Sequence, residues 1–304
     1  MKDITIIMPF LNEEFEPQKT IDSIYETANP RRFHIIAIDD CSKKYSEIRE
    51  RREITYIKNK DRIGVDACRQ LGADLSKTPY LFIIDAHMRF PRGWLGRVIE
   101  DIASDPHTLW CTTCMGLGYG NMELQRSRDY YRGADIVLHN SENEVLEPKW
   151  CNLHSEGSYE IPCVLGANYG VSAQWFKHIH GLQGLKMWGG SEMCLSLKTW
   201  MAGGSCKIDT NVKIGHKFRD VAPYSTNVWN ILYNKIYMCK TILPEDIGEY
   251  LIQHLPQNSN LNRAKKEIQK NAKSIDKEKS YYRSIFKKDF KSVCDRWKIP
   301  IPII

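Results

Sequence analysis

The first hundred residues alternate between apolar runs and stretches whose apolar positions recur with helical spacing. Four apolar runs predict strands over Ile4–Pro9, Phe33–Ile38, Ile54–Ile57 and Tyr80–Ile84. Helical spacing over 17–28 and 63–75 predicts two helices, and a third is expected over 94–103. Continuous apolar strands separated by amphipathic helices are typical of a mostly parallel sheet covered on both faces. The pattern therefore predicts an α/β, Rossmann-like fold.

The rest of the chain predicts two further kinds of structure. Residues 105–165 show no clean period, and we expect loops and short strands there. Beyond Tyr224 the spacing is helical, and from about residue 260 it is Lys-rich with aromatics interleaved; Tyr282, Phe286 and Phe290 form a stripe that we expect to dock on the body. We divide the chain into an α/β domain over 1–225 and a helical, Lys-rich C-terminal extension over 226–304.

Composition excludes several classes of protein. With 42% hydrophobic and 11% aromatic residues, the 304-residue chain is not a disordered one. No window approaches the roughly 20 uninterrupted apolar residues of a membrane span, and the N-terminus runs directly into a strand, so we expect no membrane association. Ten cysteines without regular clustering indicate reduced thiols and a cytoplasmic location, the host cytoplasm if the source is viral.

The positive charge is concentrated in the extension. Residues 260–298 hold 13 Lys or Arg against 5 Asp or Glu, a balance of +8, whereas the whole chain carries +6. The remainder of the chain is therefore slightly acidic. A solvated helical face is the ordinary explanation for such a block, and a polyanion-binding surface is the alternative.

Polar clusters follow three of the predicted strands. Asn12 and Glu13 follow the first, Asp40 ends the second, and Asp85 and His87 follow the fourth. Ligands of open α/β sheets bind beyond the carboxyl ends of the strands, so these clusters predict one site. A carboxylate and an imidazole two residues apart suit Mn²⁺ or a similar divalent ion.

Short motifs in one fixed order carry a resemblance to a known family. They are Pro9-Phe10-Leu11-Asn12-Glu13, Asp39-Asp40, Asp85-Ala86-His87 with Gly93-Trp94-Leu95, Trp188-Gly189-Gly190, Ala202-Gly203-Gly204, Gly215-His216-Lys217-Phe218-Arg219 and Pro223-Tyr224. Over about residues 3–225 the chain resembles the catalytic domain of the polypeptide N-acetylgalactosaminyltransferases, a branch of the GT-A nucleotide-sugar transferases. The resemblance implies a GT-A fold over 1–225 and metal-dependent transfer of a hexose from a UDP-sugar to a hydroxyl acceptor.

The resemblance also implies roles for particular residues. Asp85, His87 and His216 match the family's metal ligands, for Mn²⁺ or Mg²⁺, and Asp85 is also counted as catalytic. The positions implied for donor binding are Arg219 and Tyr224 at the diphosphate, Asp40 and Arg62 at the uridine, Gly166 and Ala167 at the donor sugar, and Pro9, Asn12, Glu13 and Trp188 elsewhere in the donor site.

One departure from the family pattern leaves the stereochemistry open. The family continues Trp-Gly-Gly with Glu-Asn-x-Glu, whereas this chain reads Ser191-Glu192-Met193-Cys194. Glu192 resembles the Asp of the Glu-Asp motif in inverting relatives, where that residue is the general base that takes the acceptor's proton. The other interpretation makes Glu192 a ligand of sugar hydroxyls in a retaining enzyme.

A second set of residues has the spacing of a structural zinc site. Cys111 and Cys114 form one Cys-x-x-Cys pair, and Cys151 and His154 form a Cys-x-x-His pair after 36 intervening residues. Cysteine is equally a good core residue, so we do not count these four among the site residues.

The acceptor is predicted from the charge of the extension. A cytoplasmic enzyme needs a cytoplasmic acceptor, and glycosyltransferases of bacterial viruses act on hydroxymethylated pyrimidines. We therefore expect a DNA acceptor of this kind, bound through the basic extension. The alternatives are a protein Ser or Thr or a cell-surface glycan precursor. In another class, the chain is a degenerate transferase that only binds nucleotide sugar or nucleic acid.

Overall fold

The computed structural model describes residues 2–43, 48–117, 130–141, 144–151, 156–219 and 221–303. Its first part is a parallel sheet in which β1 pairs with both β2 and β4, and β2 pairs with β3. The bounds are Ile4–Phe10 for β1, Phe33–Asp39 for β2, Ile54–Lys58 for β3 and Tyr80–Ile84 for β4. All seven residues of β1 are buried, as the continuous apolar run predicts for a central strand. The predicted strands and their parallel arrangement are confirmed.

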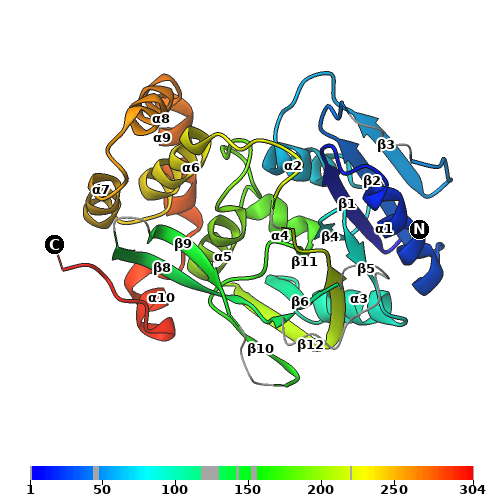
Figure 1. Cartoon of the computed structure of the whole chain (residues 1–304). Helices are drawn as coiled ribbons and strands as arrows, with labels where there is room; N and C mark the ends of the chain where they lie inside the picture. The colour runs from blue at the N-terminus through cyan, green and yellow to red at the C-terminus, as the bar shows by residue number, and fades with distance from the viewer. Residues whose placement is uncertain are drawn as a thin grey trace.

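The sheet continues past β4 in a mixed arrangement. β11 (Asn168–Ser172) runs antiparallel to β4 and to β6 (Thr108–Gly116), and β12 (Ser205–His216) runs parallel to β6. The short strands β5 (Met88–Arg89), β7 (Tyr130–Tyr131) and β10 (Ser158–Glu160) pair with β12, β6 and β12 respectively. Among the described residues the order is β10-β12-β6-β11-β4-β1-β2-β3. This is a mainly parallel sheet of the GT-A type (Figure 1).

The prediction of loops and short strands over 105–165 is wrong for part of that segment. β6 is a nine-residue strand whose first seven residues are buried. β8 (Ala134–Ser141) and β9 (Glu144–Trp150) form a separate antiparallel two-stranded sheet. The sequence of β6, Thr-Leu-Trp-Cys-Thr-Thr-Cys-Met-Gly, mixes hydroxyls and thiols with apolar residues, so neither alternation nor a continuous apolar run marks it.

Five helices accompany the sheet in the described part of the chain; the first three were predicted from amphipathic spacing, and the last two were not. They are α1 (Glu16–Thr27), α2 (Val65–Leu75), α3 (Trp94–Ser104), α4 (Ala173–His178) and α5 (Ser191–Met201). α2 packs against β1 and β2, whereas α3 packs against β6, β11 and β12. In α3 the buried apolar residues Trp94, Leu95, Val98, Ile99 and Ile102 form the stripe that faces this part of the sheet. None of the described helices has the length and apolar character required to cross a bilayer.

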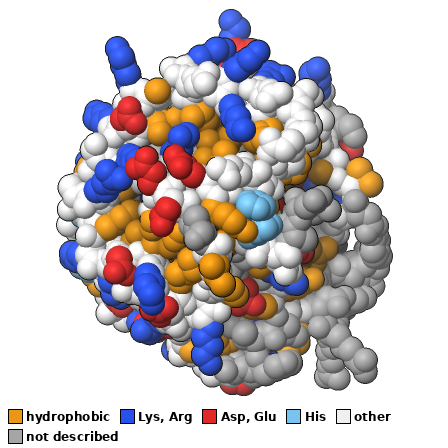
Figure 2. Space-filling view, turned by 90° about the vertical axis from the view of Figure 1, so that its left-hand side faces the viewer, with side chains coloured by type: hydrophobic (Ala, Val, Ile, Leu, Met, Phe, Trp, Pro, Cys, Tyr) orange, Lys and Arg blue, Asp and Glu red, His pale blue; other side chains and the backbone are white. Residues whose placement is uncertain are grey.

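The C-terminal extension is a set of helices on the side of the molecule away from β3 (Figure 1). They are α6 (Val228–Thr241), α7 (Glu245–Gln253), α8 (Ser259–Lys270), α9 (Ala272–Ile285) and α10 (Phe290–Trp297). Their buried residues belong to the same hydrophobic core as those of β1 and β4. Figure 2 faces this side: Lys and Arg side chains gather toward the top, and acidic and apolar side chains are interspersed below.

The aromatic stripe docks on the body, as expected, but not as one helix. α9 ends at Ile285 and α10 begins at Phe290, so Phe286 lies in the connection between them. Tyr282 and Phe290 are buried, and the rings of Tyr282 and Phe286 stack with centroids 5.8 Å apart. The Tyr282 hydroxyl lies 3.4 Å from Nζ of Lys198, a fully buried lysine of α5.

Candidate functional site

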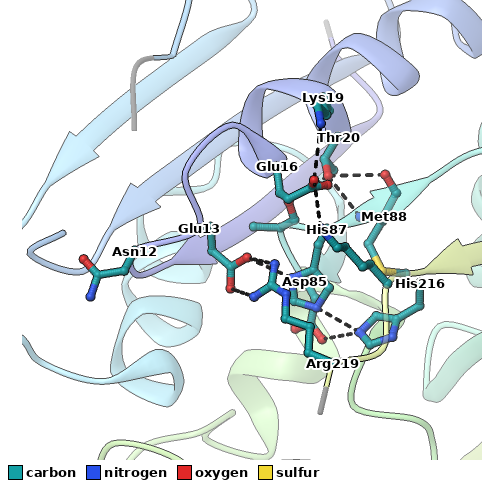
Figure 3. Close-up of polar contacts among 12 residues, drawn as sticks. Asn12, Glu13, Glu16, Lys19, Thr20, Asp85, His87, Met88, His216 and Arg219 are labelled. Atoms are coloured by element: carbon teal, nitrogen blue, oxygen red, sulfur yellow. Dashed lines mark hydrogen bonds and ion pairs between the residues drawn. The ribbon is translucent and has the colours of Figure 1, made fainter. Parts of the chain in front are cut away.

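The carboxyl ends of β1, β2 and β4 open onto a cavity of about 630 Å³. Thirteen of the fourteen residues predicted from the sequence line it, namely Pro9, Glu13, Asp40, Arg62, Asp85, His87, Gly166, Ala167, Trp188, Glu192, His216, Arg219 and Tyr224. Asn12 does not. It borders a smaller hollow of about 340 Å³, and its side-chain oxygen accepts a hydrogen bond of 2.9 Å from the backbone N–H of Lys43. Figure 3 shows Asn12 directed away from the other residues of the site.

Asp85, His87 and His216 converge in this cavity. Asp85 follows β4, and the antiparallel pairing of His216 in β12 with Met88 in β5 brings the two histidines together. Their Nε2 atoms lie 3.0 Å apart, and His216 Nε2 lies 3.4 Å from Oδ2 of Asp85. Among the described residues, only these three His, Cys, Asp or Glu side chains bring ligand atoms within 4.8 Å of one another in a way that suits a metal ion.

The protonation states of this cluster favour metal binding. Burial lowers the pKa of His216 below its usual value, so the ring is neutral at pH 7 and has a lone pair to donate. Burial alone would raise the pKa of Asp85. The contacts with His216, Arg69 and His87 outweigh it and hold that pKa at about 2, so the carboxylate is ionised. One carboxylate and two imidazoles fit a divalent transition metal.

Glu13 orients two residues of the site at once. Its carboxylate pairs with both terminal nitrogens of the Arg219 guanidinium, one of them at 2.7 Å, and its Oε2 lies 3.3 Å from Nδ1 of His87 (Figure 3). Burial alone would raise the pKa of Glu13. The contacts with His87 and Arg219 outweigh burial, so the pKa lies below its usual value. A carboxylate behind a ligating histidine fixes the tautomer that presents Nε2 to the metal.

Arg69 is a site residue that the sequence analysis missed. It lies on α2, is 5% exposed, and donates to Oδ1 of Asp85 at 3.0 Å and to the carbonyl of Gly166 at 3.1 Å. It also donates to the Ser191 hydroxyl at 3.3 Å and lies 3.8 Å from the carboxylate of Asp66. Asp66 is fully buried, and burial raises its pKa to about 7. The one signal in the sequence was this opposite-charge pair three residues apart in a predicted helix.

Asp40 shapes the far end of the cavity through the loop after β3. Its carboxylate accepts hydrogen bonds of 2.8 Å from the backbone N–H groups of Ile63 and Gly64 and one of 3.0 Å from Asn59. Gly64 has φ of 95°, and a Cβ there would lie 2.2 Å from Cα of Met187. Glycine is required at this backbone crossing.

Arg62 and Tyr224 lie together beside that loop. Arg62 donates to the carbonyl of Ser225 at 2.9 Å, and its guanidinium lies 5.5 Å from the centre of the Tyr224 ring. A planar cation and an aromatic ring at the cavity wall suit the flat base of a nucleotide.

Glu192 lies at the other end of the cavity, in the first turn of α5. Its Oε1 is so close to Gly166 that a Cβ on that glycine would lie 3.2 Å away. Burial raises the pKa of Glu192, which suits a general base. The wall around it includes three residues that sequence reasoning did not find: Glu147 and Trp150 from β9, and Lys235 from α6, which forms an ion pair with Glu147.

The proposed zinc set lies partly outside the described residues, because His154 is not among them. Cys111 and Cys114 are buried in β6, where burial raises the pKa of the Cys111 thiol to about 12. Cys151 Sγ lies 3.4 Å from the carbonyl oxygen of Gly133. The three described cysteines are not among the residues that form a metal-binding group.

Comparison with known proteins gives relatives that include several N-acetylgalactosaminyltransferases. Human polypeptide N-acetylgalactosaminyltransferase 10 is 23% identical over 90% of this chain and 47% of its own length. Polypeptide N-acetylgalactosaminyltransferase 4 of Caenorhabditis elegans is 27% identical over 74% of this chain and 40% of its own. The chain thus spans about half the length of the curated relatives it matches. These similarities confirm the resemblance seen in the motifs.

A solved structure shares the fold. A crystal structure of GalNAc-T7 with UDP, GalNAc and Mn²⁺ superposes with a TM-score of 0.77 over 99% of this chain and 59% of that one, at 18% identity. The family model for glycosyl transferase family 2 matches residues 5–158, which is half of the chain. The matched residues include β1, β2 and β4 and the Asp85–His87 motif that opens the metal cluster. The chain belongs to glycosyl transferase family 2.

Proposed function

We propose that this glycosyltransferase moves N-acetylgalactosamine from its UDP conjugate to a Ser or Thr hydroxyl of a polypeptide, with Mn²⁺ bound by Asp85, His87 and His216. The observation that carries the proposal is the convergence of these three ligands at the carboxyl ends of the strands. The relatives, named for transfer of this sugar to polypeptides, support the donor and the acceptor. The GalNAc-T7 complex with UDP and Mn²⁺ supports the nucleotide and the metal.

Different residues along the cavity bind different parts of the donor. Arg62, Tyr224 and the loop held by Asp40 receive the uridine, and Arg219, fixed by Glu13, reaches the diphosphate. Asp85, His87 and His216 would hold a divalent ion, which would neutralise the charge that develops on the UDP leaving group. Arg69 holds Asp85 in the orientation that presents Oδ2 to the His216 side.

The sugar and acceptor belong at the end of the cavity that Gly166, Trp188 and Glu192 line. We propose Glu192 as the base that removes the acceptor's proton, because it is the carboxylate of that wall whose pKa burial raises. The retaining alternative, in which Glu192 binds sugar hydroxyls, predicts the opposite anomeric outcome.

The DNA acceptor predicted from the charge of the extension has no support among the relatives, which favour the protein alternative. The extension also lacks a uniformly basic surface. Lys186 pairs with Glu267 at 2.7 Å, Lys270 lies 3.4 Å from the same carboxylate, and Lys291 pairs with Asp295 at 2.6 Å. We propose that 226–304 is a structural part of the enzyme and 1–225 the transferase domain. The cytoplasmic location stays a prediction.

Incubation of the full chain with a panel of UDP-sugars, Mn²⁺, Ser/Thr-containing peptides and hydroxymethylated DNA tests the proposal, with products read by mass spectrometry. We expect N-acetylgalactosamine on peptide hydroxyls and its loss with EDTA. Transfer to DNA alone, or transfer of another sugar alone, would contradict it. The His216→Ala variant controls for contaminating transferases.

A further inference from the structure

The segment from Gln183 to Gly190 runs along one face of α6. Three side chains of that face, Ile231, Asn234 and Met238, are spaced by three and four residues, so they project from the same side of the helix. A Cβ on Gly189 would lie 3.3 Å from Cγ1 of Ile231, and one on Gly190 would lie 2.9 Å from Cε of Met238. The segment is therefore in direct contact with α6 over its last two residues.

Tyr237 extends the same contact toward the start of the segment. Its hydroxyl donates to the carbonyl of Gln183 at 3.1 Å. A Cβ on Gly184 would lie 2.4 Å from its ring. The glycines at both ends of the segment thus permit an approach to α6 that side chains would prevent.

Asn234 fixes the middle of the segment through three hydrogen bonds, which involve both its side-chain oxygen and its amide nitrogen. Its oxygen accepts from the backbone N–H of Lys186 at 2.7 Å, and its amide nitrogen donates to the carbonyls of Lys186 and Gly189, both at 2.9 Å. The side chain is fully buried. Met187 and Trp188, the residues between the two anchored carbonyls, line the cavity.

The anchored segment is followed directly by α5, which carries Glu192. Its last residue, Gly190, is the N-cap of α5, and Ser191 and Glu192 follow in the first turn. Arg69 donates to the Ser191 hydroxyl and to Asp85, so the start of α5 is tied to the metal cluster as well. A shift of the segment would move Trp188 and Glu192 together.

Lys235, the residue of α6 that follows Asn234, contacts another wall of the cavity. Lys235 is 8% exposed and pairs with Glu147 of β9, and both line the cavity. Two consecutive residues of α6 therefore secure two walls of the sugar and acceptor end of the cavity.

We propose that Asn234 is a positioning residue of the transfer reaction: by fixing the backbone on both sides of Met187 and Trp188, it sets the place of Trp188 and Glu192 relative to the donor sugar. The proposal rests on the proposed function and makes α6 of the extension part of the active-site framework. Among the residues that the structure describes, the Asn234 side chain bonds only to the backbone of Lys186 and Gly189. Met187 crosses Gly64 of the loop held by Asp40, so we expect the loss of kcat to exceed any loss of UDP affinity.

The test compares Asn234→Ala with Asn230→Ala in the full chain. Asn230 is the matched control: it is also an asparagine of α6, lies one turn earlier and is 2% exposed. Its side-chain oxygen has no hydrogen-bond partner in the described part of the chain. We expect the kcat of N234A to fall by roughly 10²-fold, the effect of a misplacement of about 1 Å, and its affinity for UDP and Mn²⁺ to fall much less. N230A is expected to keep both.

Hydrogen exchange supplies a readout that does not depend on activity. In N234A the amides of 183–190 should exchange faster than in wild type, with β1 and β4 unchanged, and N230A should show no such local effect. Should N234A fail to fold, Asn234→Ser retains one donor and takes its place in both measurements.

The outcomes separate the two proposals. A wild-type kcat in folded N234A, or equal acceleration of exchange over 183–190 in N230A, would overturn the positioning role. A loss of UDP affinity as large as the loss of kcat would overturn it as well, because the substitution would then have disturbed the whole cavity and not only its sugar and acceptor end. If wild type transfers sugar to no polypeptide, the proposed function fails, and the exchange comparison still decides the role of Asn234.

Discussion

The Nε2 atoms of His87 and His216 lie 3.0 Å apart, although the two residues are separated by 129 positions in the sequence. A single metal ion between the two nitrogens could accept a lone pair from each of them. The pairing of β5 with β12 creates this arrangement, and it gives the first prediction.

Replacing His216 with Ala should abolish Mn²⁺-dependent transfer and leave the fold intact, because a lost ligand removes charge stabilisation of several kcal/mol at the leaving group. Transfer assays with added Mn²⁺ or EDTA, together with thermal unfolding, check this. His34→Ala is the control, since His34 lies on β2 and contacts Thr55. Full activity of H216A, or of wild type in EDTA, contradicts the metal assignment.

Replacing Glu13 with Gln should weaken Mn²⁺ binding by about 10- to 100-fold, because the carboxylate that orients His87 is lost. The same change releases Arg219, so the KM for the UDP-sugar should rise as well. Titration of Mn²⁺ by calorimetry, with UDP present and absent, separates the two effects. Unchanged affinity for the metal would show that His87 needs no orienting partner.

Replacing Glu192 with Gln should retain UDP affinity and lose about 10²-fold or more in turnover if Glu192 is the general base. Product analysis by NMR gives the anomeric configuration. An inverted product together with the loss of turnover supports the base. A retained configuration removes that role, even if the variant is inactive.

The pH dependence of stability should reveal Asp101 on α3. Burial and the neighbouring carboxylate of Asp209 raise its pKa to about 7, although Arg97 lies 3.8 Å away. A carboxyl whose pKa is higher in the folded than in the unfolded state loses stability as pH rises between those two values, here from about 4 to about 7.

Asp101→Asn removes that loss, so its advantage over wild type in Tm should grow from pH 4 to pH 7 and then stay constant. Three pKa units correspond to at most about 4 kcal/mol, and each 1 kcal/mol changes Tm by roughly 2–4 °C in a large domain, so we expect the advantage to reach several degrees. Calorimetry at several pH values measures it. An advantage independent of pH would mean that Asp101 is ionised throughout.

Charge reversal at Lys265, Lys266, Lys270 and Lys273 should leave transfer to peptides unchanged, because these side chains lie on α8 and α9 and do not line the cavity. Steady-state kinetics at low and high salt test this. If wild type binds DNA, the variant should bind it less tightly and with a flatter salt dependence. A loss of peptide transfer in a folded variant would instead give the basic surface a role in acceptor binding.

The residues that the sequence could identify are those whose type and position follow local rules. β1, β2 and β4 match their predicted runs within one residue, because strands buried on both faces must be apolar throughout. Asp85, His87 and Glu13 were found because they follow such strands. His216 was found only through its motif, since its approach to His87 depends on the pairing of β5 with β12.

The residues that sequence reasoning missed owe their roles to long-range packing. Arg69 has the spacing of an ordinary charged residue on an amphipathic helix, yet α2 buries it against Asp85. Glu147 and Lys235 are 88 residues apart and meet only after β9 and α6 have been placed. No local pattern marks such residues, because the partner that gives each its function is distant in the chain.

The close contact between the backbones of Gly64 and Met187 limits which residues can replace Gly64 in evolution. A Cβ at position 64 would collide with backbone, which cannot move aside as a flexible side chain would. Gly93 also has a positive φ, of 83°, but nothing lies within 4 Å of where its Cβ would be. Asparagine or aspartate can therefore replace Gly93 at modest cost, whereas any line of descent that keeps this fold keeps glycine at position 64.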